Sequence, residues 1–230
     1  MDKPIGEHET KFVFANNRSQ ILIAWLRLRC QPDWKYPVGK ISSIYFDSLD
    51  WRLLQEKIDS DFFKTKVRLR WYSDAKSGNK LPATFLEIKN KIGSSRKKKR
   101  IQTTSTSDWI SSLPLHDPQL LKISAMAREY TGNLYGHLHP AFQIDYQRYR
   151  FVDSVSGARL SVDFNIHVPK SNARMLSQSN TTCLKSGVFE LKGNNDSLPD
   201  WLHQLTALGC KKESFSKYGS CYAHLKQIIY

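Results

Sequence analysis

Charged residues recur at every second position in six short segments of this chain. Successive side chains of a β-strand point to opposite faces, so each set shares one face of its strand. Arginine binds phosphate oxygens bidentately and lysine neutralises them as a point charge, whereas carboxylates coordinate divalent cations. These residue types therefore favour binding of a phosphate-rich ligand together with a metal ion. The sets are Glu7-Glu9-Lys11, Lys66-Arg68-Arg70, Glu87-Lys89-Lys91, Arg96-Lys98-Arg100, Arg148-Arg150 and Glu190-Lys192.

The whole chain carries the same excess of positive charge. Its 230 residues include 35 Lys and Arg against 21 Asp and Glu, which gives a formal net charge of +14. This balance implies a polyanionic partner, which could be nucleic acid, anionic lipid or a phosphate-rich ligand. Hydrophobic residues make up 40% of the chain, enough to bury a substantial core, and we expect a single domain over residues 1–230.

Two other interpretations of the charged faces stay open at this point. The first is an ordinary amphipathic sheet whose charges face water. Against it, cations grouped by sign repel one another unless an anion lies between them. The second is a nucleic-acid surface, in which the basic run 96–100 binds the backbone while Trp71, Tyr72 and Tyr149 stack on bases. Competition between tripolyphosphate and duplex DNA separates these ideas, and we expect nucleic acid not to be the partner.

The charged sets lie on elements whose patterns are typical of strands and helices. Turn sequences at Gly93-Ser94 and at residues 154–157 predict antiparallel hairpins. Polar stretches at 73–81 and 170–187 predict exposed loops. Helical patterns cover residues 19–29, 117–130, 199–208 and the stretch after Gly219. Eight segments alternate like strands, at residues 7–14, 41–46, 63–72, 83–92, 95–102, 142–152, 158–166 and 188–193.

Short motifs along nearly the whole chain resemble the triphosphate tunnel metalloenzymes, also called the CYTH superfamily. The first segment, residues 7–11, fits their Glu-x-Glu-x-Lys signature. A longer series resembles the VTC branch of the superfamily, the catalytic domain of the vacuolar transporter chaperone complex and its bacterial relatives. This series consists of Tyr45-Phe46-Asp47, Arg52-Leu53-Leu54, and residues 66–72, 85–89, 146–148, 159–163, 189–192 and 214–218.

The resemblance implies both a fold and an activity. The fold is α+β: a closed, eight-stranded antiparallel β tunnel with helices packed outside. The activity is that of a polyphosphate polymerase, which transfers the γ-phosphoryl group of ATP onto a growing polyphosphate chain inside a basic tunnel. The cofactor it implies is Mn²⁺ or Mg²⁺. Five residues are then expected to be catalytic: Arg68, Arg70, Lys89, Arg148 and Lys217.

A wider set of residues is expected to surround the substrate and the metal. The resemblance and the shared charged faces indicate these as substrate-binding residues: Lys11, Arg52, Lys66, Lys91, Arg96, Lys98, Arg100, Tyr146, Arg150, Arg159, Lys192 and Ser216. The expected metal ligand is Glu190, accompanied by Glu7, Glu9, Glu87 and Asp163. In this interpretation the expected partners are ATP and inorganic polyphosphate.

Two alternatives to a polymerase stay open. One is a tripolyphosphatase or nucleoside triphosphatase of the same fold, because both Glu7 and Glu9 are present and a glutamate can orient and deprotonate water. The other is a non-catalytic domain that binds polyphosphate or nucleic acid. Product analysis after incubation with ATP and metal distinguishes all three.

The sequence also predicts where the protein works. No apolar run approaches the roughly 20 residues that cross a bilayer, and the start Met1-Asp2-Lys3-Pro4 lacks the apolar core of a secretory signal. We therefore expect a cytoplasmic protein that reaches a membrane only through a separate membrane protein that receives the polymer. The four cysteines show no Cys-x-x-Cys spacing and are expected to be free thiols.

Overall fold

The computed structural model describes residues 8–59, 61–93, 95–131, 136–176, 181–193 and 199–227. Within it the chain divides into two compact units, and each is described by itself below. Unit 1 comprises Met1–Gly39, Tyr146–Ile166 and Leu184–Ser216. Unit 2 comprises Lys40–Asp145, His167–Cys183 and Lys217–Tyr230. The expectation of a single domain stays a prediction.

The strands form an antiparallel sheet that differs in part from the prediction. All eight predicted strands are confirmed, and three two-residue strands accompany them: β2 (Gln31–Pro32), β9 (Thr182–Cys183) and β11 (Lys211–Lys212). The strand order is β11-β1-β10-β8-β7-β3-β4-β5-β6, with β2 on β7 and β9 on β8. Among the described residues the sheet therefore has eleven strands and is open, so the prediction of a closed sheet of eight strands is wrong. Two-residue strands are too short to show alternation, and closure depends on pairings that a sequence pattern does not record.

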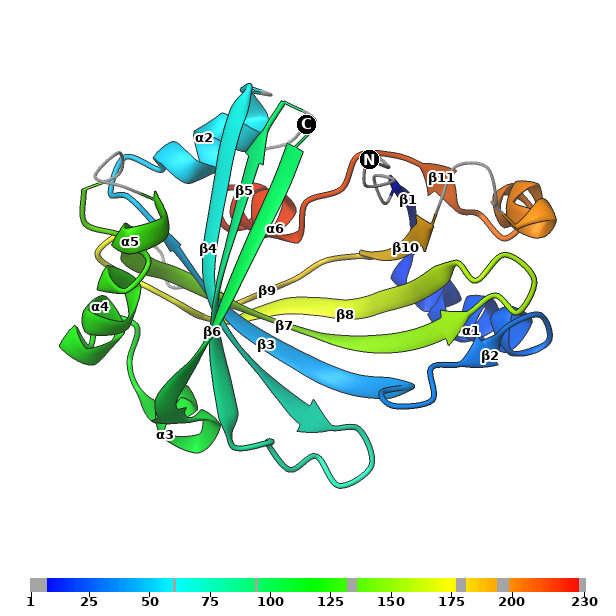
Figure 1. Cartoon of the computed structure of the whole chain (residues 1–230), viewed down its shortest axis with the longest axis horizontal. Coiled ribbons are helices and arrows are strands. Elements are labelled where there is room, and N and C mark those ends of the chain that lie inside the picture. The colour runs from blue at the N-terminus through cyan, green and yellow to red at the C-terminus, as the bar shows by residue number, and fades with distance from the viewer. Residues whose placement is uncertain are drawn as a thin grey trace, which may run out of the picture. The chain divides into compact units, whose positions relative to one another are not determined.

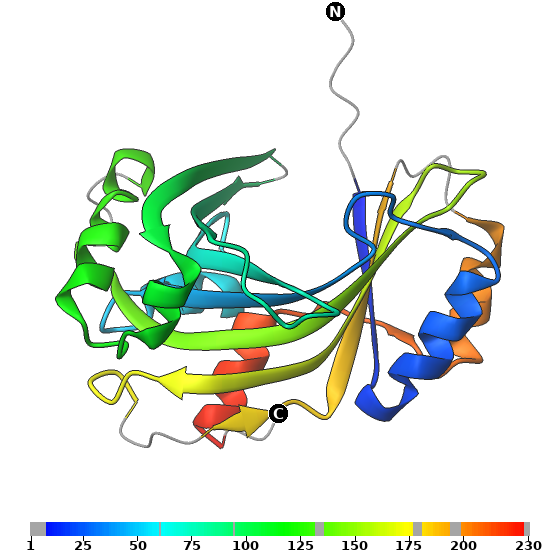
Figure 2. The same cartoon turned by 90° about the horizontal axis from the view of Figure 1, so that it is seen from below.

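The strands of unit 1 have one charged and one apolar face. They are β1 (His8–Ala15), β10 (Ser186–Gly193), and parts of β7 (His139–Val152) and β8 (Arg159–Ser171). β1 and β8 both pair antiparallel with β10, which places Phe12 opposite Phe189 and Lys11 opposite Glu190. The apolar face packs against α1 (Ser19–Arg27), and Figure 2 shows α1, in blue, beside the 3₁₀ helix η3 (Asp200–Thr206), in orange. The charged face is thereby left on the side opposite this core.

Unit 2 repeats this arrangement with longer strands. They are β3 (Val38–Asp47, from Lys40 on), β4 (Phe63–Asp74), β5 (Ala83–Ile92) and β6 (Ser95–Thr106), and β4, β5 and β6 run side by side (Figure 1). Val67, Leu69 and Ile88 point to the apolar face and are buried there. Three helices cover that face: α3 (Ser107–Ser112), α4 (Pro118–Ala125) and α5 (Arg128–Thr131).

Local sequence patterns predicted the helices only in part. The single helix predicted over 117–130 is two helices, α4 and α5, separated at Met126 and Ala127. The predicted helix over 199–208 is the 3₁₀ helix η3, and α6 (Lys217–Leu225) begins before Gly219. Two further helices, α2 (Arg52–Ile58) and α3, were not predicted, because seven and six residues give too few turns for a periodic stripe. A short 3₁₀ helix, η1 (Asn16–Arg18), precedes α1.

Two further expectations can be compared with the structure. None of the helices in the described ranges is long and apolar enough to cross a membrane. All four cysteines are free thiols, as predicted; Cys183 is exposed, whereas Cys30, Cys210 and Cys221 are buried. Burial raises the pKa of the Cys221 thiol, which keeps it protonated and inert at neutral pH.

Candidate functional site

Strands β4, β5 and β6 bring nine cations onto one face of unit 2. Their register forms rows across the three strands, in which Lys66, Lys89 and Lys98 lie opposite one another. The next row joins Lys64, Lys91 and Arg96, so two successive rows consist of cations alone. We call this surface the basic face of unit 2. It comprises Lys64, Lys66, Arg68 and Arg70 from β4, Lys89 and Lys91 from β5, and Arg96, Lys98 and Arg100 from β6, with Glu87 among them.

Among the described residues of β4, β5 and β6, Glu87 is the carboxylate that lies between these cations, and four of them contact it. Its side chain is 1% exposed. Arg68 donates to Oε2 from Nη2 at 2.7 Å and from Nε at 2.9 Å, and the ammonium of Lys98 lies 2.8 Å from Oε1. The guanidinium groups of Arg70 and Arg100 follow at 3.7 and 3.9 Å. Glu87 thus acts as a shared counter-ion for four cations.

The electrostatics of Glu87 follow from these contacts. Burial alone would raise the pKa of its carboxyl, but the charges of Arg68 and Arg70 and the hydrogen bonds from Lys98 and Arg68 lower the pKa below its ordinary value. Glu87 is therefore ionised at neutral pH. Sequence reasoning made it a metal ligand, whereas the structure engages both carboxylate oxygens with cations.

Uncharged residues of the same face fix the two arginines of β4. Arg68 donates from Nη1 to the hydroxyl of Tyr45 at 3.1 Å, and Arg70 donates from Nε to Ser43 Oγ at 3.0 Å. Arg100 lies over the ring of Phe85, 3.7 Å from its centroid. Sequence reasoning assigned no role to Ser43, Tyr45 or Phe85. Tyr45 belongs to the Tyr45-Phe46-Asp47 motif, and Ser43 lies two residues before it on the same face of β3. This motif and spacing were the sequence features that could have indicated both residues.

A second group of charged side chains lies on the charged face of unit 1. Lys11 Nζ is 3.0 Å from Glu9 Oε1 and 3.8 Å from Glu190 Oε1, and Lys192 Nζ is 3.4 Å from Glu9 Oε2. Arg148 makes a bidentate pair with Asp163, with both N–O distances at 2.5 Å, and lies 3.5 Å from Glu190. We call this group the mixed cluster of unit 1; it comprises Glu9, Lys11, Arg148, Asp163, Glu190 and Lys192.

Charges in the mixed cluster compensate one another. Burial opposes the charge on Arg148, but Asp163, Tyr146 and Glu190 raise the pKa of the guanidinium well above its ordinary value. Burial and Glu190 raise the pKa of Glu9, while Lys11 and Lys192 lower it, and the net pKa is below its ordinary value. Glu9 and Arg148 are therefore charged at neutral pH.

The remaining predicted residues are distributed over both units. In unit 1, Tyr146 has its ring 5.5 Å from the Arg148 guanidinium, and Arg159 lies opposite Lys192 in the β8–β10 register. Arg150 donates to the carbonyl of Tyr36 at 2.9 Å. Ser216 ends unit 1, and in unit 2 Arg52 and Lys217 are the first residues of α2 and α6. Glu7 and Ser94 lie outside the described residues.

The donor set restricts where a metal ion could bind. In the described ranges, no three His, Cys, Asp or Glu side chains converge as a metal site would require. Glu190 and Glu9 are the carboxylates best suited to the task, because they share Lys11 and their side chains keep 12% and 23% exposure. Mg²⁺ and Mn²⁺ commonly bind one or two carboxylates and complete their shell with substrate phosphate and water. The mixed cluster fits such a shared ion.

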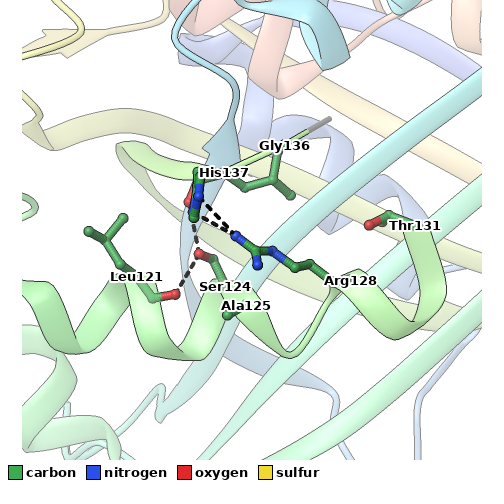
Figure 3. Close-up of a pocket in the computed structure, with 8 residues that line it drawn as sticks. Leu121, Ser124, Ala125, Arg128, Thr131, Gly136 and His137 are labelled. Carbon is green, nitrogen blue, oxygen red and sulfur yellow. Dashed lines mark hydrogen bonds between the residues drawn. The ribbon is translucent and has the colours of Figure 1, made fainter. Parts of the chain in front are cut away.

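Figure 3 shows a small pocket of unit 2. There Arg128 Nη2 lies 2.6 Å from His137 Nδ1, and Ser124 Oγ donates to the carbonyls of Leu121 and Leu138. None of the predicted site residues lines it. Its lining consists of Leu121, Ser124, Ala125, Arg128, Thr131, Gly136, His137 and Leu138.

Two solved structures resemble this chain in fold. One is a provisionally assigned adenylate cyclase from Bacillus halodurans, with 12% identity and a TM-score of 0.53, covering 92% of this chain and 95% of that one. The other is the PH1819 protein from Pyrococcus horikoshii OT3, with 12% identity and a TM-score of 0.52, covering 94% and 99%. At this identity the likeness concerns the fold alone. No curated protein matches the chain.

Sequence similarity to one protein family is more specific. A profile described as the VTC domain matches residues 7–226. The match includes both charged groups described above and all the strands that carry them. The chain therefore belongs to the VTC domain family, as its motifs predicted.

Proposed function

We propose that this protein is a polyphosphate polymerase that transfers the γ-phosphoryl group of ATP to a growing polyphosphate chain with the help of Mn²⁺ or Mg²⁺. Membership of the VTC domain family supports a protein that acts on triphosphates. The observation that carries the proposal is the basic face of unit 2, where nine cations lie in register on three strands and four of them contact the carboxylate of Glu87. A ligand with several phosphates compensates this excess of charge, and bidentate arginine contacts suit its oxygens.

The proposed reaction moves one phosphoryl group without a covalent enzyme intermediate. A terminal phosphate oxygen of the acceptor chain attacks the γ-phosphorus of ATP and forms a new P–O bond. The bond between the γ-phosphorus and the β–γ bridging oxygen breaks, ADP leaves with that oxygen, and the chain grows by one phosphate. The acceptor oxygen is already anionic near neutral pH, so transfer needs no general base.

The protein's part in this reaction is positioning and charge neutralisation. Negative charge spreads over the transferred phosphoryl oxygens, and fixed cations stabilise it without reorganising. Arg68 and Arg70 suit this role because their side chains are held by Glu87, Tyr45 and Ser43 before any ligand binds. In unit 1, Arg148 is held in the same way by Asp163.

We assign the metal ion to Glu190, with Glu9 as its neighbour. A divalent cation bound there would neutralise phosphate charge and orient the donor triphosphate. Glu87 and Asp163 receive no metal in this proposal, because arginines already engage their oxygens.

Product analysis tests the proposal. The purified protein is incubated with ATP and MnCl₂ and followed by phosphorus NMR, with gel staining for long chains. We expect signals of internal chain phosphates to grow together with ADP. Free orthophosphate without polymer would instead identify a triphosphatase, and unchanged ATP would leave a binding domain as the better account.

A matched pair of lysine variants connects the assay to the basic face. Lys89 lies on the basic face, whereas Lys97 of β6 lies on the opposite face, and both side chains are exposed. Lys89→Ala should lower the rate of polymer formation by about 10-fold or more. Lys97→Ala, which removes the same charge, should leave the rate unchanged. Equal rates in the two variants would contradict the assignment of the basic face.

A further inference from the structure

A buried carboxylate, Asp47, connects the starts of two helices of unit 2. Its side chain is fully buried at the end of β3. Oδ1 accepts the backbone N–H of Ser48 at 2.9 Å and that of Leu53 at 2.8 Å, while Oδ2 accepts the N–H of Leu54 at 3.0 Å. Asp47 therefore satisfies two amides of the first turn of α2 from five residues before that helix begins, while Ser48 Oγ accepts the amide of Arg52.

Trp51, the residue that directly precedes α2, does not cap the helix with its own side chain. Trp51 has a left-handed backbone, with φ 60° and ψ 33°, and its side chain makes no capping hydrogen bond. A non-glycine residue in that region costs free energy and persists only where its surroundings hold it. Trp51 packs on Tyr222 of α6, with ring centroids 4.6 Å apart. The contacts of Asp47 and Trp51 thus fix the path of the chain from Asp47 to Arg52.

The second helix reaches Asp47 through a tyrosine. Tyr218, the second residue of α6, donates its hydroxyl to Asp47 Oδ2 at 2.7 Å. Its ring stacks on Tyr45 with centroids 4.8 Å apart and an interplanar angle of 10°, and also on Phe142 at 5.0 Å. Burial and the negative charge of Asp47 raise the pKa of Tyr218, so its hydroxyl stays a hydrogen-bond donor.

The chain of contacts ends at the basic face. Tyr45, stacked on Tyr218, accepts a hydrogen bond from Arg68 Nη1 at 3.1 Å. Arg52 and Lys217 are the residues with which α2 and α6 begin, and both helix starts are attached to Asp47. Contacts therefore link three expected phosphate ligands, from separate parts of the sequence, to one buried carboxylate.

We propose that Asp47, acting through Tyr218 and Tyr45, is a positioning residue that sets Arg52, Arg68 and Lys217 for phosphate binding. The inference rests on the proposed function, since Arg68 belongs to the basic face and Arg52 and Lys217 are expected ligands of the same substrate. Asp47 touches no substrate in this account. Its effect reaches the ligand through the two tyrosine hydroxyls and the two helix starts.

Calorimetric titration with inorganic tripolyphosphate tests the inference with minimal substitutions. Tyr218→Phe removes the hydroxyl that reaches Asp47 and keeps the stacked ring, and Tyr45→Phe removes the acceptor for Arg68. Each should weaken tripolyphosphate binding by about 10-fold. The control is Tyr130→Phe on α5, whose ring packs on the apolar side of the sheet and which should bind like wild type. Circular dichroism establishes that every variant is folded at the temperature of the titration.

A double-mutant cycle separates positioning from a general loss of stability. Arg68→Lys keeps the charge but loses the forked contacts to Tyr45 and Glu87. If Tyr45 acts by placing Arg68, Tyr45→Phe should change affinity by less than about 2-fold in the Arg68→Lys background. A purely structural role predicts the same loss in both backgrounds.

The outcomes distinguish this inference from the proposed function. If wild-type protein does not bind tripolyphosphate, the proposed function is overturned. If wild type binds and both tyrosine variants match it, or if the loss in Tyr45→Phe is additive with that in Arg68→Lys, the positioning role is overturned and the proposed function stands. Weaker binding in both variants, with coupling to Arg68, supports the positioning role.

Discussion

The basic face of unit 2 and the mixed cluster of unit 1 have the same origin and different charge balance. Each arises from strands that alternate charged and apolar residues, with helices covering the apolar side. In unit 2, nine cations share one face, and four of them contact the carboxylate of Glu87. In unit 1, Glu9, Asp163 and Glu190 pair with Lys11, Arg148 and Lys192.

This difference indicates what each group is suited to bind. The mixed cluster is internally neutralised, and its two partly exposed carboxylates can exchange a lysine for a metal ion. The basic face keeps an excess of positive charge that only a polyanion relieves. The predictions below test this contrast, from the largest expected effect to the smallest.

Removing Arg68 should have the largest effect. Its guanidinium is held by Glu87 and Tyr45 and is only partly exposed, so no neighbour can replace its forked contacts. Arg68→Ala should lower polymer formation from ATP by about 100- to 1,000-fold. The measurement is the initial rate of ADP release, with Lys97→Ala as the control. A rate within a few-fold of wild type would remove Arg68 from the site.

Glu87→Gln should expose the charge excess of the basic face directly. Without the carboxylate, four neighbouring cations lose their counter-ion, and the free energy of unfolding should fall by about 3 kcal/mol. Tripolyphosphate should restore much of this loss, because it supplies the missing negative charge. Urea unfolding with and without tripolyphosphate measures both effects. Destabilisation that phosphate leaves unchanged would mean that the face does not bind it.

Asp47 should make stability depend on pH in a defined window. Burial raises its pKa from 3.8 to about 6, although Tyr218 and the amides of α2 oppose the rise. Between these values the folded state keeps the proton that the unfolded state has lost, so stability should fall as pH rises from 4 to 6 and then level off. The contribution is about 2–3 kcal/mol. Urea unfolding of Asp47→Asn should lack it, and an identical pH profile in both proteins would refute the assignment.

Glu190→Gln should act on the metal and leave the basic face intact. The mixed cluster then loses its best metal ligand, and Mn²⁺ affinity should fall by at least about 10-fold. Mn²⁺ binding in the presence of tripolyphosphate can be followed by water-proton relaxation, while calorimetry without metal should show unchanged tripolyphosphate affinity. Asp163→Asn is unsuitable as a control, because it would leave Arg148 buried without its partner.

Neighbouring lysines of β6 give the smallest and most local test. Lys98 points to Glu87 on the basic face, whereas Lys99 lies over the ring of Tyr130 on the other face. Lys98→Ala should weaken tripolyphosphate binding by about 5-fold. Lys99→Ala should have no measurable effect at the same ionic strength. A larger loss of affinity in Lys99→Ala than in Lys98→Ala would favour a ligand on the face opposite the basic face.

Period-two alternation was enough to predict the charged faces and all eight long strands. It did not predict which residues face one another across strands, since register depends on pairings between distant segments. Glu87 was therefore expected to bind metal, whereas its neighbours in space are arginines and a lysine. The sequence therefore identified Glu87 as a residue of the charged face but did not predict which side chains surround it.

The helices that carry expected ligands were harder to predict for a related reason. α2 is short and its first turn is capped by Asp47 rather than by an adjacent residue, so the usual capping signal is absent. The contact between Tyr218 and Asp47 joins residues 171 positions apart. A local sequence pattern does not predict such a contact, although both residues lie in motifs that resemble the VTC branch.

The central claim is that the basic face of unit 2 binds substrate phosphate, and titration of tripolyphosphate into ¹⁵N-labelled protein tests it most directly. The side-chain N–H signals of Arg68 and Arg70 are followed together with the backbone amides of Lys97 and Lys99. We expect saturable shifts of the two arginine signals at substoichiometric to stoichiometric ligand, with small changes at the two lysines. Unchanged arginine signals, or saturable shifts at Lys97 and Lys99 alone, would contradict the claim.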